Sequence, residues 1–170
     1  AKHRYLTTLK GIYWGFFENS QCTAETVLLL IESADRAIDH ETDEIKDFTF
    51  IESYFKGSWF LKILMKLKKN FIFRKLAKRY LYTNISFIYD VTVNYVEAHH
   101  ECKHLITEII HNEKILQRLG IEVDNEVRKA ENKLHRELEE NFPEVLKAVQ
   151  HKRGGYYLIN KMRAFVTEMI

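Results

Sequence analysis

The sequence contains few of the residues that interrupt regular structure, with one proline and six glycines in 170 positions. Residues of this kind punctuate folds built from many short strands, so their scarcity argues against such a fold. Leucine, lysine and glutamate, which favour helices, are abundant instead. We therefore predict an all-α protein made of a helical hairpin, a basic amphipathic linker helix, and a long helix with shorter helices packed along it.

Cysteines and long apolar runs are also scarce. Cys22 and Cys102 are eighty residues apart and belong to no paired spacing, which indicates reduced thiols in a cytosolic setting rather than a disulfide framework. The longest uncharged stretch, from Tyr80 to Tyr89, has ten residues, whereas a membrane-spanning helix needs about 20. We therefore expect no part of this sequence to cross a bilayer.

Acidic residues are absent from one long segment. Residues 53–89 contain nine Lys or Arg and no Asp or Glu, whereas the remainder contains 17 basic and 24 acidic residues. The near-neutral total therefore combines a segment of charge +9 with a remainder of charge −7. The nine cations lie within residues 56–83, which we call the basic strip.

The spacing of apolar residues divides the chain into three regions. Residues 1–55 are predicted to form the helical hairpin and an acidic connection, with a first helix ending near Asn19 and a second capped by the hydroxyl of Thr23. Residues 56–83 are the basic amphipathic linker, and residues 84–170 are a long-helix bundle. In the linker, apolar side chains recur by four, three and four residues at Phe60, Leu64, Leu67 and Phe71.

The third region begins with an apolar seam that we expect on one long helix ending at Gly120. Steps of three and four continue for over thirty residues, as in a coiled coil, so the seam needs a partner helix from this chain or from a second copy. A polar residue at one seam position would fix the register at some cost in stability. The seam consists of Ile88, Val91, Tyr95, Ala98, Cys102, Leu105, Ile109, Asn112, Leu116 and Leu119.

Two features predict where the last helices begin and end. Pro143 suits the first turn of a helix, and Asn141 is a candidate for its cap. The pair Gly154 and Gly155 is expected to break the chain before a final helix.

The best candidate for chemistry is the stretch EAHHECKH, in which Glu97, His100, Glu101 and His104 share a helical face. Two Glu-x-x-His spacings, one here and one ending at His111, match those of helical di-iron proteins. Those proteins take the two motifs from separate helices, whereas here they lie about 16 Å apart along one helix. We therefore interpret this face as ordinary polar surface, with no metal, cofactor or catalytic residue expected, and a small metalloenzyme as the minor alternative.

The basic strip suits an anionic ligand. Anionic lipid headgroups fit it well, because aromatic and aliphatic side chains can insert while each nearby Lys or Arg adds about 1 kcal/mol. An acidic protein such as calmodulin is the alternative, since apolar anchors and basic residues alternate as in its targets. Nucleic acid is not expected, because no base-reading motif accompanies the charge.

Three blocks of the chain resemble the cytosolic part of sodium/proton exchangers of the sperm-specific and the plant salt-overly-sensitive types. They are TLKGIYWGFFENSQCTAETVLLLIESADRAID at residues 8–39, LYTNISFIYDVTVNYVEAHHECKHLITEI at residues 81–109, and ELEENFPEVLKAVQHKRGGYYLINKM at residues 137–162. The blocks follow one another in the same order as in those exchangers. The sperm-specific type has a voltage sensor between the first two blocks, where this chain has only the basic strip.

The resemblance implies a regulatory domain of a homodimeric antiporter at the cytosolic face of the plasma membrane, or of the flagellar membrane for the sperm-specific type. Its partners would be the rest of the antiporter chain, a second copy and the anionic membrane surface. The candidate headgroup contacts are Lys62, Lys66, Lys68, Lys69, Arg74, Lys75, Lys78 and Arg79. The side chains expected to enter the interface are Trp59, Phe60, Phe71 and Phe73.

Overall fold

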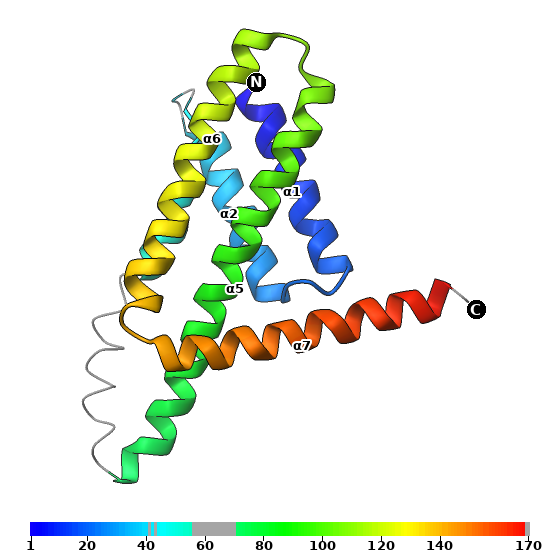
Figure 1. Cartoon of the computed structure of the whole chain (residues 1–170). Coiled ribbons are helices and arrows are strands. Elements are labelled where there is room, and N and C mark those ends of the chain that lie inside the picture. The colour runs from blue at the N-terminus through cyan, green and yellow to red at the C-terminus, as the bar shows by residue number, and fades with distance from the viewer. Residues whose placement is uncertain (41, 43, 56–70, 169–170) are drawn as a thin grey trace.

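The computed structural model describes residues 1–40, 42, 44–55 and 71–168, with side-chain surroundings for residues 1–40, 42, 44–55 and 79–155. This described part of the chain is all-helical and contains no strand, which confirms the predicted fold class. One long helix runs through the molecule, and shorter helices pack along it (Figure 1).

The first two helices form the predicted hairpin. Helix α1 spans Lys2–Glu18 and helix α2 spans Ala24–Asp39. The hydroxyl of Thr23 accepts a hydrogen bond from the backbone N–H of Thr26 at 3.2 Å, so Thr23 caps α2 as predicted. In the tight turn between the helices, Ser20 has a φ of 56°.

Helix α3, Phe48–Phe55, lies between α2 and α6. Helix α5 spans Phe71–Ile109, a continuous run of 39 residues. It therefore begins inside the basic strip, and it ends well before the predicted end at Gly120.

The prediction that the long helix ends at Gly120 was wrong, because Asn112 caps a new helix after α5 has ended at Ile109. The side-chain oxygen of Asn112 accepts from the N–H of Ile115 at 3.2 Å and starts helix α6, Glu113–Leu134. Gly120 lies inside α6, since one glycine costs a helix only about 1 kcal/mol. Helix α6 then runs back beside α5 (Figure 1).

A π-helical turn, His135–Glu139, leads into helix α7, Pro143–Glu168. Pro143 occupies the first turn of α7 as predicted. Asn141 does not cap α7 with its side chain but donates to the carbonyl of Arg136 at 2.6 Å, which closes the preceding turn. The predicted break at Gly154 and Gly155 was also wrong, because the backbone stays helical through both residues.

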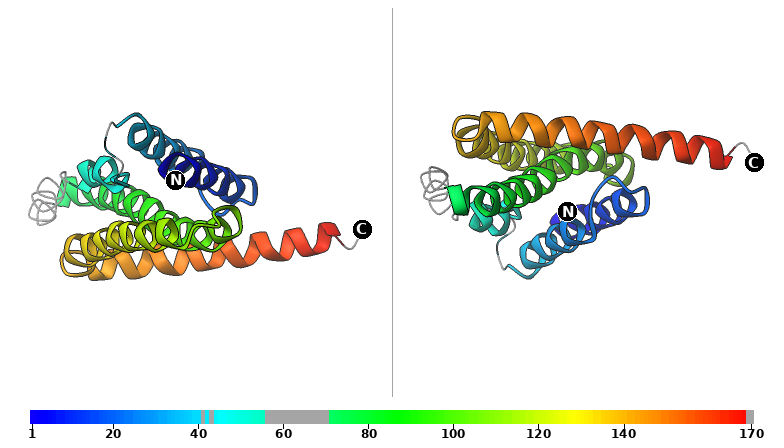
Figure 2. Two further views of the ribbon diagram at one scale, coloured as in Figure 1. Left: turned by 90° about the horizontal axis from the view of Figure 1, so that it is seen from above. Right: turned by 90° about the horizontal axis from the view of Figure 1, so that it is seen from below.

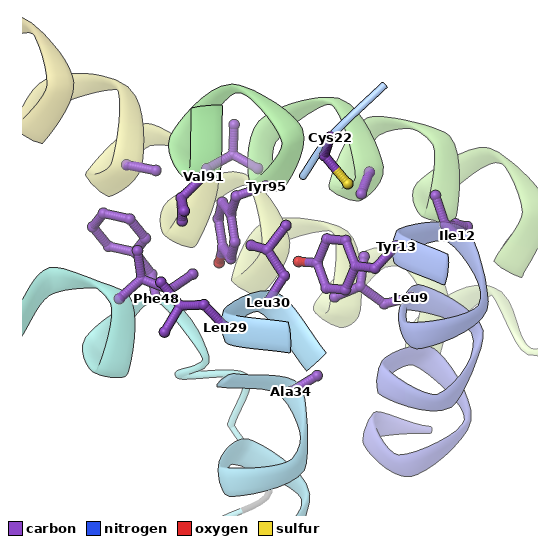
Figure 3. Close-up of a cluster of buried hydrophobic side chains, with 14 of the residues drawn as sticks. Leu9, Ile12, Tyr13, Cys22, Leu29, Leu30, Ala34, Phe48, Val91 and Tyr95 are labelled. Atoms are coloured by element: carbon purple, nitrogen blue, oxygen red, sulfur yellow. The ribbon is translucent and has the colours of Figure 1, made fainter. Parts of the chain in front are cut away.

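Helix α5 separates two layers of the molecule. The α1 and α2 hairpin covers one side of α5, and α6 and α7 cover the other (Figure 2). The core fills the space between these elements. In Figure 3 the side chain of Leu30 lies between the rings of Tyr13 and Tyr95, with Phe48 beside them, and all four residues are at most 2% exposed.

Candidate functional site

The basic strip is the first candidate site, and the structure describes only its last part. Arg74, Lys75, Lys78 and Arg79 lie on the first turns of α5, as do Phe71 and Phe73. Among these residues the side-chain surroundings are described for Arg79 alone, which is exposed. The remaining candidates lie outside the described residues, and they are Trp59, Phe60, Lys62, Lys66, Lys68 and Lys69.

The cations on α5 recur at a spacing of one helical turn. Arg74 and Lys78 are four residues apart, as are Lys75 and Arg79, a spacing at which two positions of a helix share a face. Like charges at this spacing destabilise a helix by about 0.2 to 0.5 kcal/mol per pair. The first turns of α5 also extend past the ends of α1, α2 and α6 (Figure 1). An anion bound there would offset this repulsion.

The predicted seam has its partner within the chain. Ile88, Val91, Tyr95, Ala98 and Cys102 are all buried in the core. At the end of α5 the pattern differs from the prediction, because Leu105 and Ile109 are 39% and 45% exposed. Their neighbours Ile106 and Ile110 are buried instead.

The change of buried face follows from helix geometry. A straight helix has 3.6 residues per turn, so a strict seven-residue repeat drifts off the contact face unless the helices supercoil. Asn112, expected inside the seam, caps α6 and is exposed. Leu116 is half-buried and Leu119 is buried, both on α6 rather than on the seam helix.

The polar face in EAHHECKH shows no built metal site. Glu97, His100, Glu101 and His104 are exposed, and within the described residues no three His, Cys, Asp or Glu side chains are arranged to hold a metal ion. Cys102, which follows Glu101, is fully buried, and this burial raises the pKa of its thiol to about 12. The thiol is therefore neutral and suits packing better than nucleophilic chemistry.

The most unusual feature of this region is His99, which was not among the site residues predicted from the sequence. Its ring is fully buried and hydrogen-bonded on both sides. Nδ1 lies 2.8 Å from the hydroxyl of Tyr5, and Nε2 lies 3.0 Å from a carboxylate oxygen of Asp47. The other oxygen of Asp47 accepts a hydrogen bond from the hydroxyl of Tyr95 at 2.8 Å. We call these four residues the buried polar network.

The buried polar network joins three elements. Tyr5 comes from α1, Asp47 from the connection before α3, and Tyr95 and His99 from α5. All four residues are at most 1% exposed. Because these residues have almost no contact with solvent, a substrate does not reach them. The network is therefore better suited to holding the three elements together.

Helix α6 holds the same connection from the other side. A carboxylate oxygen of Glu126 accepts from the backbone N–H of Phe48 at 3.3 Å, and Glu122 accepts from that of Ile45 at 3.3 Å. Glu126 is only 2% exposed, and Lys129 donates to its second oxygen. Burial raises the pKa of Glu126, the hydrogen bond from Lys129 opposes that rise, and the charge of Asp47 adds to it.

Helix α7 crosses α5 at a cleft of about 580 Å3. Arg153 lies in this cleft, with its guanidinium 3.8 Å from a carboxylate oxygen of Asp90 and 3.7 Å from one of Glu97. Asp90 also accepts from the hydroxyl of Thr26 on α2 at 2.7 Å. These contacts tie the middle of α7 to α5 and, through Asp90, to the hairpin.

Within the part of the chain that the structure describes, no helix is long and apolar enough to cross a membrane. No protein-family model matches the chain, and no curated protein matches its sequence.

Proposed function

We propose that the chain is a non-catalytic regulatory domain of a sodium/proton antiporter in the plasma membrane. It lies against the cytosolic leaflet, helps the antiporter to dimerise, and controls ion exchange. The three blocks that resemble such exchangers support this proposal. They form most of the α1 and α2 hairpin, the part of α5 from residue 81 to its end, and the turn before α7 together with most of α7, and these elements pack against one another.

The observation that carries the proposal is the continuity of α5. This helix begins among the cations of the basic strip and runs without a break into the core. At 1.5 Å per residue its 39 residues span about 58 Å. A contact made at the first turns is therefore transmitted to the packed core as a displacement of one rigid element.

The charge of the strip supports a membrane as the partner. The like-charge pairs on the first turns of α5 have no acidic residue near them in sequence, since residues 53–89 contain none. An anionic leaflet supplies the missing negative charge over an extended surface, at about 1 kcal/mol for each Lys or Arg near it.

A dimer would use a surface other than the seam. Residues Ile88 to Cys102 of the seam are buried within one chain, so they are not free to pair with a second copy. Dimerisation stays a prediction, and sedimentation equilibrium of the chain joined to its transport domain would test it.

Vesicle flotation tests the membrane contact. The variant carries Arg74→Glu, Lys75→Glu and Lys78→Glu, and the matched control carries Lys114→Glu, Arg128→Glu and Lys147→Glu at exposed positions on α6 and α7. Both sets change the net charge equally. We expect the wild type and the control to bind vesicles containing phosphatidylserine, less so at high salt, and the strip variant to bind about 100-fold more weakly.

Two results would contradict the membrane contact. One is binding of the wild type that is equally strong to neutral and to anionic vesicles. The other is an equal loss of binding in the strip variant and in the control. If no vesicle binds but calmodulin forms a calcium-dependent complex of defined stoichiometry, the strip recognises an acidic protein instead.

A further inference from the structure

The buried polar network can satisfy its hydrogen bonds in two protonation states. With a neutral His99 ring, Nε2–H donates to Asp47 at 3.0 Å and Nδ1 accepts from the hydroxyl of Tyr5 at 2.8 Å. The hydroxyl of Tyr95 donates to the second oxygen of Asp47 at 2.8 Å. Every polar atom of the ring then has a partner.

One added proton requires only a rotation of the Tyr5 hydroxyl. When both ring nitrogens of His99 carry protons, Nδ1–H donates to the Tyr5 oxygen. The Tyr5 hydroxyl then turns its own proton toward the main-chain carbonyl oxygen of His99, which lies 3.5 Å away. The site can therefore gain or lose a proton without a movement of its heavy atoms.

The charges around the network give the two protonation states different free energies. Without the added proton, the ionised carboxylate of Asp47 is a buried charge with no cation among the four residues, and such a charge is costly. With the proton, Asp47 and His99 form an ion pair. The other titratable groups that interact with the network are Tyr13 on α1, Cys102 on α5, and Asp124 and Glu126 on α6.

These neighbours do not replace the missing positive charge. None of the groups just named is a cation, and Lys129 on α6 donates its hydrogen bond to Glu126. Asp124 pairs with Lys103 in the same way, at 2.7 Å. Tyr13 and Cys102 are uncharged, because burial raises the pKa of both groups.

We infer that the buried polar network is a proton-binding site that sets how firmly the connection before α3 is held to α5 and α6. Asp47 is the part of this connection that binds the network, and Ile45 and Phe48 beside it are held by Glu122 and Glu126. Loss of the proton leaves the buried carboxylate of Asp47 without a positively charged partner. We expect this to loosen the connection. This inference does not depend on the antiporter proposal, because it concerns this chain alone.

Two measurements on the purified chain test the site together. The 15N shifts of the His99 ring report its protonation from about pH 5.5 to about pH 8.5. Amide hydrogen exchange at Ile45 and Phe48, corrected for its intrinsic dependence on pH, reports opening of the connection. We expect exchange to become at least about tenfold faster as His99 loses its proton, with one midpoint for both measurements.

Two variants distinguish a pH dependence that comes from this site from one that comes from Glu126 or from surface histidines. His99→Gln keeps an N–H for Asp47 but cannot titrate, so it should abolish the step in exchange. His135→Gln removes an exposed ring that lies beside Glu139 and should leave the step unchanged. If His99→Gln does not fold, the two wild-type measurements decide the question alone.

Two results would overturn the inference. One is a His99 ring that keeps the same protonation state over the whole range. The other is a step that persists in His99→Gln, which would assign the pH dependence to Glu126.

Discussion

Asp47 is the residue through which the connection before α3 reaches the centre of the molecule. We expect Asp47→Ala to lower the free energy of unfolding by about 3 to 5 kcal/mol, because the Tyr95 hydroxyl and the His99 ring each lose a buried hydrogen-bond partner. Urea unfolding followed by circular dichroism would measure the loss.

An exposed carboxylate provides the control. Asp35 pairs with Lys10 in a partly exposed ion pair, and Asp35→Ala should cost less than about 1 kcal/mol. Equal costs for the two substitutions would show that the buried polar network contributes no more than a surface pair.

Glu126 gives a prediction about pH. Because burial raises its pKa above the ordinary value of 4.5, the folded chain holds this proton more tightly than the unfolded chain does. The resulting stability is present below that value and is lost as the pH rises. We therefore expect Glu126→Gln to become progressively more stable relative to the wild type from about pH 4.5 to about pH 7.5.

Unfolding curves over that pH range would measure the difference. Glu131→Gln, at an exposed position on the same helix, should show no such trend. A stability difference that stays constant or falls with rising pH in Glu126→Gln would contradict the account.

At the residue scale the sequence predicted apolar burial better than polar burial. His99 follows Tyr95 by four residues and so shares its face, which is a signal that could have identified a buried histidine. Asp47 carries no such signal, because it lies among other acidic residues in the connection. Its role depends on contacts with residues about fifty positions away, and local spacing does not encode such contacts.

At the scale of elements, substitution of the two glycines in α7 tests whether this segment is a continuous helix or a hinge. A methyl group added at Gly154 or Gly155 would meet no atom within 4 Å, and both residues are helical. Each change to Ala should therefore stabilise the helix by about 0.5 to 1 kcal/mol. Thermal unfolding of the double variant should move to higher temperature, and an unchanged or lower midpoint would show that the glycines act as the break expected from the sequence.

Caps explain why some element boundaries were predictable and others were not. Thr23 follows a turn and precedes an apolar face, so a helix cap is the one interpretation that fits it. The structure confirms that Thr23 caps α2. Asn112 fits both a polar seam position and a helix cap, and the spacing of its neighbours does not distinguish the two. The cap prevails because α6 must turn back to bury Val123, Val127 and Ala130 against the core.

At the scale of the whole molecule, the sequence predicts charge distribution more readily than contacts. The excess of cations in the strip follows directly from composition, and so does the acidic remainder. Which helices pair does not follow, because a seam encodes an apolar face but not the identity of its partner. The structure supplies that partner from the same chain and leaves the basic first turns of α5 beyond the ends of α1, α2 and α6 (Figure 1).

Sodium/proton exchange by a full-length antiporter that carries this chain would test the proposed membrane contact and its consequence together. The chain would be wild type, the strip variant with Arg74→Glu, Lys75→Glu and Lys78→Glu, or the control with Lys114→Glu, Arg128→Glu and Lys147→Glu. If the strip seats the domain on the membrane and α5 transmits that contact, exchange changes several-fold in the strip variant, and the control matches the wild type. Equal exchange by all three proteins, at equal surface expression, would contradict the account.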